Sequence, residues 1–215
     1  MSKAHQTFED PFHWVSRAIR KIHSWWLKWT YPFVSVGRNF SAHHSCDLRR
    51  PAANYMKIGD NVILERNVRL DVPVIPETDD PVILLGERCV LGQRTTVLAI
   101  NRIEIRSDTI FAASVLVTDH NHAFEDVNTP IWKQGGTKGG TVCIEEGCWV
   151  GFGAIIAANE AELVIGKNSV IGANALVTRS IPPYSVVSGN PARVVKQYDP
   201  TTRKWVLGSV TPSPK

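Results

Sequence analysis

The chain has 215 residues, of which 43% are hydrophobic and 20% charged, and its formal net charge is +4. This composition excludes a disordered chain, and no apolar run approaches the roughly 20 residues that a membrane-spanning helix needs. The small positive charge is compatible with phosphate-bearing ligands but too weak to indicate nucleic acid as a partner.

The compartment is predicted from the first residues and from the cysteines. The stretch from Met1 to Trp14 lacks the charged and then apolar layout of a secretory signal. No C-x-x-C pair occurs among the four cysteines, which are Cys46, Cys89, Cys143 and Cys148. We therefore expect a cytoplasmic protein with reduced thiols, in which Cys89 and Cys148 are small apolar core residues.

Residues 1–50 are predicted to form an N-terminal segment rich in aromatic and basic residues. Within it, Trp14 to Trp29 is predicted to be a helix, because apolar residues recur on one stripe at helical spacing. These are Trp14, Ala18, Ile22, Trp25 and Trp29, while Arg17, Arg20, Lys21 and Lys28 lie mostly elsewhere. Two interpretations stay open: the helix packs on the protein or a neighbouring subunit, or it lies peripherally on a membrane.

Residues 51–190 repeat with a period of six, which is neither the 3.6 of a helix nor the 2 of a meander. An apolar residue heads each sextet, and a small or β-branched residue usually stands four places later. The heads are Ile58, Leu64, Leu70, Leu85, Leu91, Val97, Ile105, Phe111, Val117, Ile144, Val150, Ile156, Ile165, Ile171 and Val177. Short strands with a turn every sixth residue fit this pattern, three strands completing a coil of about 18 residues.

The pattern resembles that of the hexapeptide-repeat proteins. The resemblance implies an all-β fold, a left-handed parallel β-helix. Its left hand is taken from the family, because connections between parallel strands are normally right-handed. The fold also hosts γ-class carbonic anhydrases and non-catalytic subunits, so it does not by itself determine the activity.

The repeat is interrupted after Val117. The heads at 105 and 144 are 39 residues apart, against 20 or 21 for neighbouring coils, so we predict a protruding loop over residues 118–141. Three interpretations compete for His120 and His122 at its start: a metal site, a solvated turn, or a general base. A metal site needs at least three ligands, and no histidine follows residue 122, so we expect no metal.

Three stretches resemble the hexapeptide-repeat O-acetyltransferases, particularly the galactoside and maltose acetyltransferases and the bacterial polysaccharide O-acetyltransferases. They are VTDHNHAFED, EEGCWVGFGAII and VIGANALVTRSIPPYSVVSGNPARVVK. In that family the histidine that opens the long loop is the catalytic base, which implies this role for His120. Where the family often has His-Pro, this chain has His120-Asn121, and Asp-His-Asn-His is closer to the polysaccharide branch. The resemblance puts Trp149 on the acceptor side, and we expect His122 and Asp119 in the loop to shape that side as well.

The segment from Ile181 to Lys196 carries the most specific motif, in which a Gly-Asn-Pro turn precedes two cations suited to phosphate groups. In the resembled family, acetyl-coenzyme A lies in a groove between two subunits. The cofactor-binding residues implied here are Gly151, Phe152, Ala173, Thr178, Arg179, Arg193 and Lys196. Phe152 replaces the small polar residue of the family pattern. Residues 191–215 are predicted to be a C-terminal tail.

The resemblance thus implies direct transfer of an acetyl group from acetyl-coenzyme A to a hydroxyl of a sugar or polysaccharide precursor, in a homotrimer. The alternatives are acetylation of a small xenobiotic, an amino sugar or serine, a γ-type carbonic anhydrase, and a non-catalytic scaffold subunit. The loop-opening His120 and the cations Arg193 and Lys196 argue against the scaffold. The sequence leaves open the acceptor, the hydroxyl, the pathway, and whether Asp119 or a loop carbonyl orients His120.

Overall fold

The computed structural model describes residues 13–76, 78–159 and 161–208. Residues 1–12, on which the expected lack of a secretory signal depends, and the last part of the predicted tail, 209–215, lie outside the described residues. Within the described ranges, no helix combines the length and the hydropathy of a membrane span.

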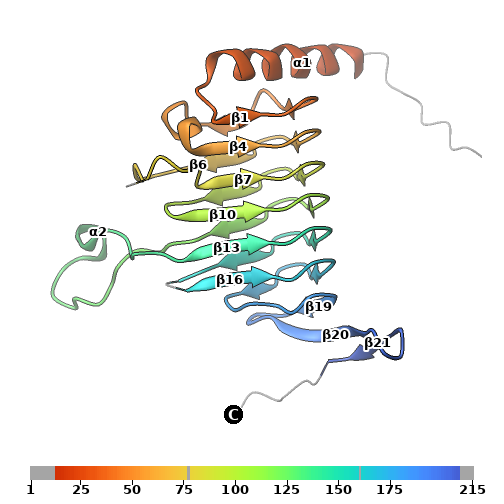
Figure 1. Cartoon of the computed structure of the whole chain (residues 1–215). Helices are drawn as coiled ribbons and strands as arrows, with labels where there is room; N and C mark the ends of the chain where they lie inside the picture. Colours follow the sequence, from red (N-terminus) through yellow and green to blue (C-terminus); the bar gives the residue numbers. More distant parts are fainter. Residues whose placement is uncertain (1–12, 77, 160, 209–215) are drawn as a thin grey trace, which may run out of the picture.

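The chain winds into a three-sided prism of stacked coils, and each coil gives one short strand to each of three sheets (Figure 1). Sheet A contains β1 (Ser35–Val36), β4 (Met56–Ile58), β7 (Ile83–Leu85), β10 (Arg102–Ile105), β13 (Thr141–Ile144) and β16 (Glu162–Ile165). Sheet B contains β2 (Ser41–Ala42), β5 (Ile63–Leu64), β8 (Val90–Leu91), β11 (Ile110–Phe111), β14 (Trp149–Val150), β17 (Val170–Ile171), β19 (Ser185–Ser188), β20 (Arg193–Asp199) and β21 (Lys204–Leu207). Sheet C contains β3 (Asp47–Leu48), β6 (Arg69–Asp71), β9 (Thr96–Leu98), β12 (Leu116–Thr118), β15 (Ile155–Ala157) and β18 (Leu176–Val177).

Successive coils pair in parallel, with equivalent residues in register. Ile105 of β10 pairs with Leu85 above and Ile144 below, and Phe111 of β11 lies between Leu91 and Val150. The prediction of a left-handed parallel β-helix is confirmed.

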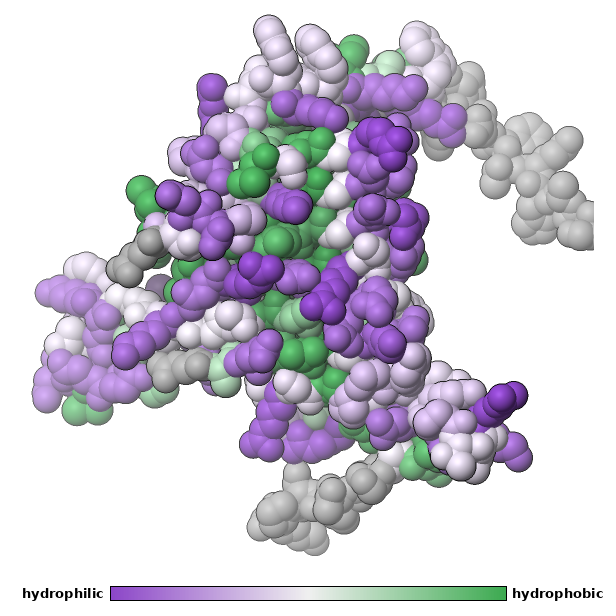
Figure 2. All heavy atoms as spheres, in the orientation of Figure 1, coloured by the Kyte–Doolittle hydropathy of each residue, from purple (hydrophilic) through white to green (hydrophobic). Residues whose placement is uncertain are grey.

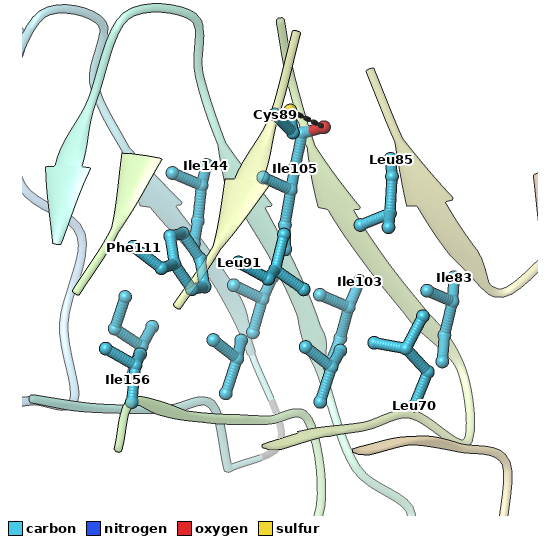
Figure 3. Close-up of a cluster of buried hydrophobic side chains, with 14 of the residues drawn as sticks. Leu70, Ile83, Leu85, Cys89, Leu91, Ile103, Ile105, Phe111, Ile144 and Ile156 are labelled. Carbon is cyan, nitrogen blue, oxygen red and sulfur yellow. Dashed lines mark hydrogen bonds between the residues drawn. The ribbon is translucent and has the colours of Figure 1, made fainter. Parts of the chain in front are cut away.

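The predicted sextet heads form the centre of the core. All of them are at most 3% exposed, and Figure 3 shows several, among them Leu91, Ile105 and Ile144, converging on one interior. Residues four places after a head, such as Cys89 and Cys148, are buried as well. The period of six therefore arises because each strand contributes its inward residue at the same place in every coil.

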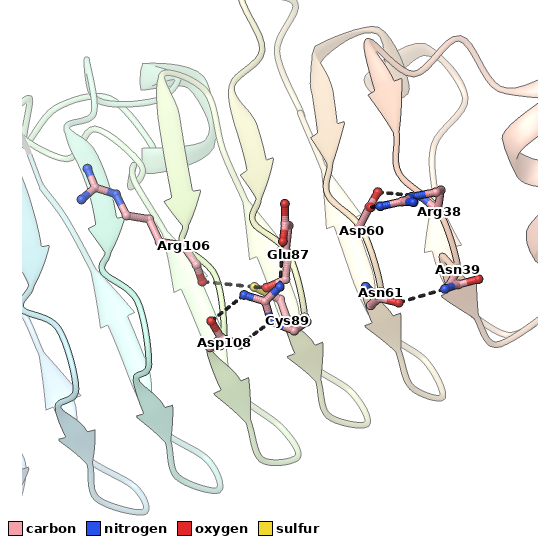
Figure 4. A network of polar contacts seen from close by, with 9 residues as sticks. Arg38, Asn39, Asp60, Asn61, Glu87, Cys89, Arg106 and Asp108 are labelled. Atoms are coloured by element: carbon pink, nitrogen blue, oxygen red, sulfur yellow. Dashed lines mark hydrogen bonds and ion pairs between the residues drawn. The ribbon is translucent and has the colours of Figure 1, made fainter.

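The turns between sheets A and B explain the polar residues at fixed offsets. Asn39, Asn61 and Asp108 have positive φ there, a conformation that asparagine and aspartate tolerate better than most residues. Their side chains also link successive coils (Figure 4): Asn39 Nδ2 donates to Asn61 Oδ1 at 3.0 Å, and Arg88 Nε donates to Asp108 Oδ1 at 2.6 Å.

Both ends of the prism extend beyond residues 51–190. A first coil formed by β1, β2 and β3 lies within residues 1–50, because Val36, Ala42 and Leu48 continue the spacing of six. At the other end, β19, β20 and β21 pair antiparallel as a meander. A short 3₁₀ helix, η1 (Pro51–Tyr55), joins the first and second coils.

Helix α1 (His13–Thr30) lies across the N-terminal end of the prism (Figure 1). It packs through Leu27 and Ser24, both buried, and Ser24 Oγ accepts a hydrogen bond from the N–H of Ala42 at 2.9 Å. The predicted stripe of Trp14, Ala18, Ile22, Trp25 and Trp29 faces away, and its tryptophans and Ile22 are exposed. The helix therefore does pack on the protein, but through the side opposite its apolar stripe.

Replacing the largest core side chain should destabilise the prism. For Phe111→Ala we expect a loss of about 3–5 kcal/mol in the free energy of unfolding, because a cavity opens between coils. The exposed Phe124 is the matched control, and Phe124→Ala should change stability by less than about 0.5 kcal/mol. Denaturant unfolding measures both, and equal losses would contradict this packing.

The buried thiols should be unreactive. Burial raises the pKa of Cys89 and of Cys148 to about 11, and only a thiolate is alkylated readily. We expect iodoacetamide at about pH 8 to leave both unmodified in the folded protein and to label both after unfolding. Mass spectrometry of peptides gives the answer, and fast labelling of either in the folded state would oppose it.

Candidate active site

His120 stands at the corner of the prism where the chain leaves β12, the strand that ends at Thr118. Its side chain is 18% exposed, and Nδ1 lies 2.9 Å from Oδ1 of Asp119, whose side chain is completely buried. The scaffold thus presents one imidazole at its surface and supports it from beneath with a carboxylate.

The Asp119 carboxylate is itself held by the preceding coil. It accepts hydrogen bonds from the backbone N–H groups of Ile100 at 3.0 Å, Asn101 at 2.9 Å and Arg102 at 3.0 Å, which reach both of its oxygens. A carboxylate surrounded by N–H donors accepts from Nδ1, so the neutral ring carries its proton on Nδ1 and leaves Nε2 as the basic nitrogen. Asp119, expected on the acceptor side and also considered as the group that orients His120, lies under the imidazole with Oδ1 2.9 Å from Nδ1.

The base of the loop is tied together at this corner. The N–H of Gly140 donates to the carbonyl of Asp119 at 2.7 Å, and Asn101 Nδ2 donates to the carbonyl of Lys138 at 2.7 Å. Gly139 has a φ of +69°, and a Cβ there would meet the Asp119 carbonyl oxygen at 2.8 Å, so the position requires glycine. Both ends of the loop are therefore anchored next to His120, while its middle, with α2 (Ile131–Gln134), protrudes (Figure 1).

A groove of about 470 Å³ runs from this corner along sheet C. Its lining residues are Pro73, Val74, Leu98, Leu116, Thr118, His120, Asn121, His122, Trp132, Gly135 and Gly136. Both predicted loop histidines thus face one groove, together with the exposed indole of Trp132. A largely apolar lining with few polar groups is typical of small-molecule sites.

A larger hollow of about 620 Å³ lies over sheet A, away from this corner. Figure 2 looks onto this face and shows apolar side chains along its middle, between hydrophilic edges. Its polar lining includes ion-paired groups such as Arg106 and Glu104, joined at 3.0 Å, and no histidine lines it. We favour the smaller groove as the site because it contains an oriented base.

The predicted acyl-donor residues fall at separate corners of the single chain. Thr178, Arg179 and Arg193 line one small hollow after β18, and Lys196 is exposed on β20. Gly151, Phe152 and Ala173 occupy the turns between sheets B and C.

These turns are stacked, since a Cβ on Gly151 would lie 2.7 Å from the Ala173 nitrogen. Trp149 is exposed on the outer side of β14 in sheet B, and it does not line the groove that contains His120. The structure therefore brings His120, His122 and Asp119 together, whereas the other predicted residues are not gathered around them within one copy.

The described residues include no group of three or more His, Cys, Asp or Glu side chains placed to hold a metal ion. The other close histidine pair, His43 and His44, has ring centroids 4.1 Å apart and lies in the turn between β2 and β3 of the first coil. Burial, followed by the neighbouring His44 and Arg20, lowers the pKa of His43. This pair is three coils away from His120.

Comparison with known proteins gives no matching family model, but individual relatives are informative. Over 130 residues the chain is 28% identical to WbbJ of Escherichia coli K12, whose name describes a lipopolysaccharide biosynthesis O-acetyl transferase, covering 58% of this chain and 65% of that protein. It is 35% identical over 95 residues to a galactoside O-acetyltransferase of Lactococcus lactis, covering 44% and 43%. The chain is related to hexapeptide-repeat acetyltransferases. It spans less than two thirds of the length of these relatives.

Among solved structures, the N-acyltransferase AntD from Bacillus cereus, in complex with dTDP and 3-hydroxybutyryl-CoA, superposes with a TM-score of 0.63. The match covers 86% of this chain and 89% of AntD at 19% sequence identity. At this identity the likeness shows a common fold.

The Asp119 carboxylate should also be structural. In Asp119→Asn an amide nitrogen replaces one acceptor oxygen, so a backbone N–H of Ile100–Arg102 or the imidazole loses its partner. We expect the free energy of unfolding to fall by about 1–3 kcal/mol, measured with denaturant. Asp80→Asn, at an exposed aspartate, is the control and should have little effect. Equal stabilities of the two variants would mean that the buried carboxylate does not support the corner.

Proposed function

We propose that the protein is an acetyl-coenzyme A-dependent O-acetyltransferase whose acceptor is a hydroxyl of a sugar or polysaccharide precursor. The observation that carries the proposal is the Asp119–His120 pair, an oriented imidazole at the head of a 470 Å³ groove. Because the chain is related to acetyltransferases, acetyl transfer is the reaction in which we expect this base to act.

The geometry supports direct transfer with His120 as general base. Nδ1–H stays bonded to Asp119, and Nε2 takes the proton of the acceptor hydroxyl as its oxygen attacks the thioester carbonyl. The carbon–sulfur bond then breaks, coenzyme A leaves as a thiolate, and the proton held by His120 neutralises it. The Asp119 carboxylate stabilises the imidazolium formed between these steps.

The acceptor side of the groove suits a saccharide. Trp132 offers an exposed indole face for a sugar ring, and His122 and Asn121 offer polar contacts beside His120. WbbJ and the galactoside O-acetyltransferase carry acceptors of this class in their names. An amino group is the second candidate acceptor, because AntD shares the fold and is an N-acyltransferase.

Acetyl-coenzyme A is proposed to bind between two copies of the chain in a homotrimer. A second copy is needed because the residues predicted to hold the acyl donor lie at two different corners of one prism. Sheet B offers a surface for the association, since its outward residues form an apolar ladder in register. The ladder is Ile63, Val90, Ile110, Trp149, Val170 and Val186. Ile110 and Trp149 are 50% and 55% exposed in the single chain, and monomers rarely expose such a continuous apolar surface.

Removing the imidazole should abolish most of the activity. We expect His120→Ala to lower kcat by a factor of about 10²–10⁴ with little change in KM for acetyl-coenzyme A. The measurement is thiol release from acetyl-coenzyme A with a panel of sugars and amino sugars. His122→Ala is the matched control, with a smaller effect that falls mainly on the acceptor KM. Wild-type rates in His120→Ala would refute the assignment of the base.

A charge on the ladder of sheet B should break the assembly without unfolding the prism. We expect Ile110→Arg to convert a trimer into a monomer in sedimentation equilibrium, because it places a charge in the proposed interface. The prism should stay folded, since this side chain is already half exposed in one copy. Ile22→Arg, at an exposed isoleucine of α1, should remain trimeric. A wild-type monomer, or an Ile110→Arg trimer, would exclude this interface.

A further inference from the structure

Helix α1 turns an apolar face away from the protein. This outer face consists of Trp14, Ile19, Ile22, Trp25, Trp26 and Trp29, which are 45–77% exposed. Figure 2 shows pale and green side chains at this end of the molecule, pointing away from the coils. Four tryptophans on the outside of one helix are not explained by the fold or by the proposed reaction.

The orientation of α1 is fixed by contacts on its inner side. Leu27 and Ser24 are buried against the first coil, Arg20 forms an ion pair of 2.9 Å with Glu65, and Lys28 Nζ donates to the carbonyl of Gly37 at 3.0 Å. These contacts hold the helix across the end of the prism, so its outer face stays exposed while the helix remains packed on the first coil.

The charges of α1 identify what the outer face fits. The helix contains Arg17, Arg20, Lys21 and Lys28 and no acidic residue. Lys21 and Lys28 are exposed, and they line a hollow together with Trp25 at one side of the outer face. Tryptophan is the residue that most favours the boundary between lipid tails and headgroups, and cations beside it attract anionic headgroups. Pairing this face with that of a second copy would instead bring two sets of cations together.

We propose that α1 docks the protein on the surface of a bilayer that contains anionic lipids. The helix lies in the interface, since none of the described helices has the character of a membrane span. In the proposed trimer, with its axis along the prism, three copies of α1 would face the same bilayer and reinforce one another.

End-on docking would place the candidate groove at a defined height. His120 lies three coil steps of ~4.8 Å from the first coil. That coil lies one packing distance of ~10 Å from α1. The groove therefore lies ~25 Å from the bilayer surface on which α1 rests. On the proposed function, this is within reach of a saccharide chain anchored in the same membrane.

Vesicle co-sedimentation of the full chain tests the docking. The vesicles are phosphatidylcholine alone, or phosphatidylcholine with about a third phosphatidylglycerol. We expect binding to the mixed vesicles that weakens at high salt, and a loss of at least about tenfold in Trp25→Ala/Trp29→Ala. Trp205→Ala, at an exposed tryptophan in β21 at the other end of the prism, should bind like wild type.

Three results would overturn the docking: no binding by the wild type, equal binding by the double variant, or a smaller assembly of the double variant without lipid. The last would mean that the outer face joins protein copies. Thiol release in solution separates this test from that of the proposed function, because the double variant should retain wild-type activity on a soluble acceptor.

Discussion

The register between coils is the constraint on which the rest of the structure depends. Each coil pairs with the next through equivalent positions, such as Leu85, Ile105 and Ile144, and a slip of one residue would turn every core side chain outward. Because short strands of two to four residues recur at the same height of each coil, the corners also stack. A residue at a corner therefore meets the backbone of the coil above it at a predictable place.

The candidate site uses this stacking at the point where it is interrupted. After Thr118 the chain leaves the prism, so the loop does not continue the backbone pairing below Ile100, Asn101 and Arg102. The Asp119 carboxylate takes the N–H groups of these three residues and also accepts from His120 Nδ1. One buried group thus completes the coil and orients the imidazole, which explains why a loop residue has a fixed geometry.

The sequence was sufficient for the fold, because burial at every sixth position leaves a direct periodic signal. It left open the choice between Asp119 and a loop carbonyl as the group beside His120, because the partners of Asp119 are backbone N–H groups 17–19 residues earlier that carry no side-chain signature. The first coil was hidden because Ala42 is a weak apolar signal. The outward orientation of Trp25 and Trp29 was hidden because periodicity shows which side of a helix is apolar but not which side meets the protein. The roles of the acyl-donor residues remain predictions, because a second copy of the chain is needed to complete the site that they would form.

On the proposed function, Asp119 fixes the proton of the neutral imidazole on Nδ1 and leaves Nε2 free for the acceptor. Nitrogen-15 NMR of the histidine side chains tests it most directly, with the His120 signals assigned by their absence in His120→Ala. In the neutral ring we predict a protonated Nδ1 and an unprotonated Nε2, with the preference lost in Asp119→Ala. A neutral His120 that carries its proton on Nε2 would contradict the account, because that nitrogen could not then accept the proton of a hydroxyl.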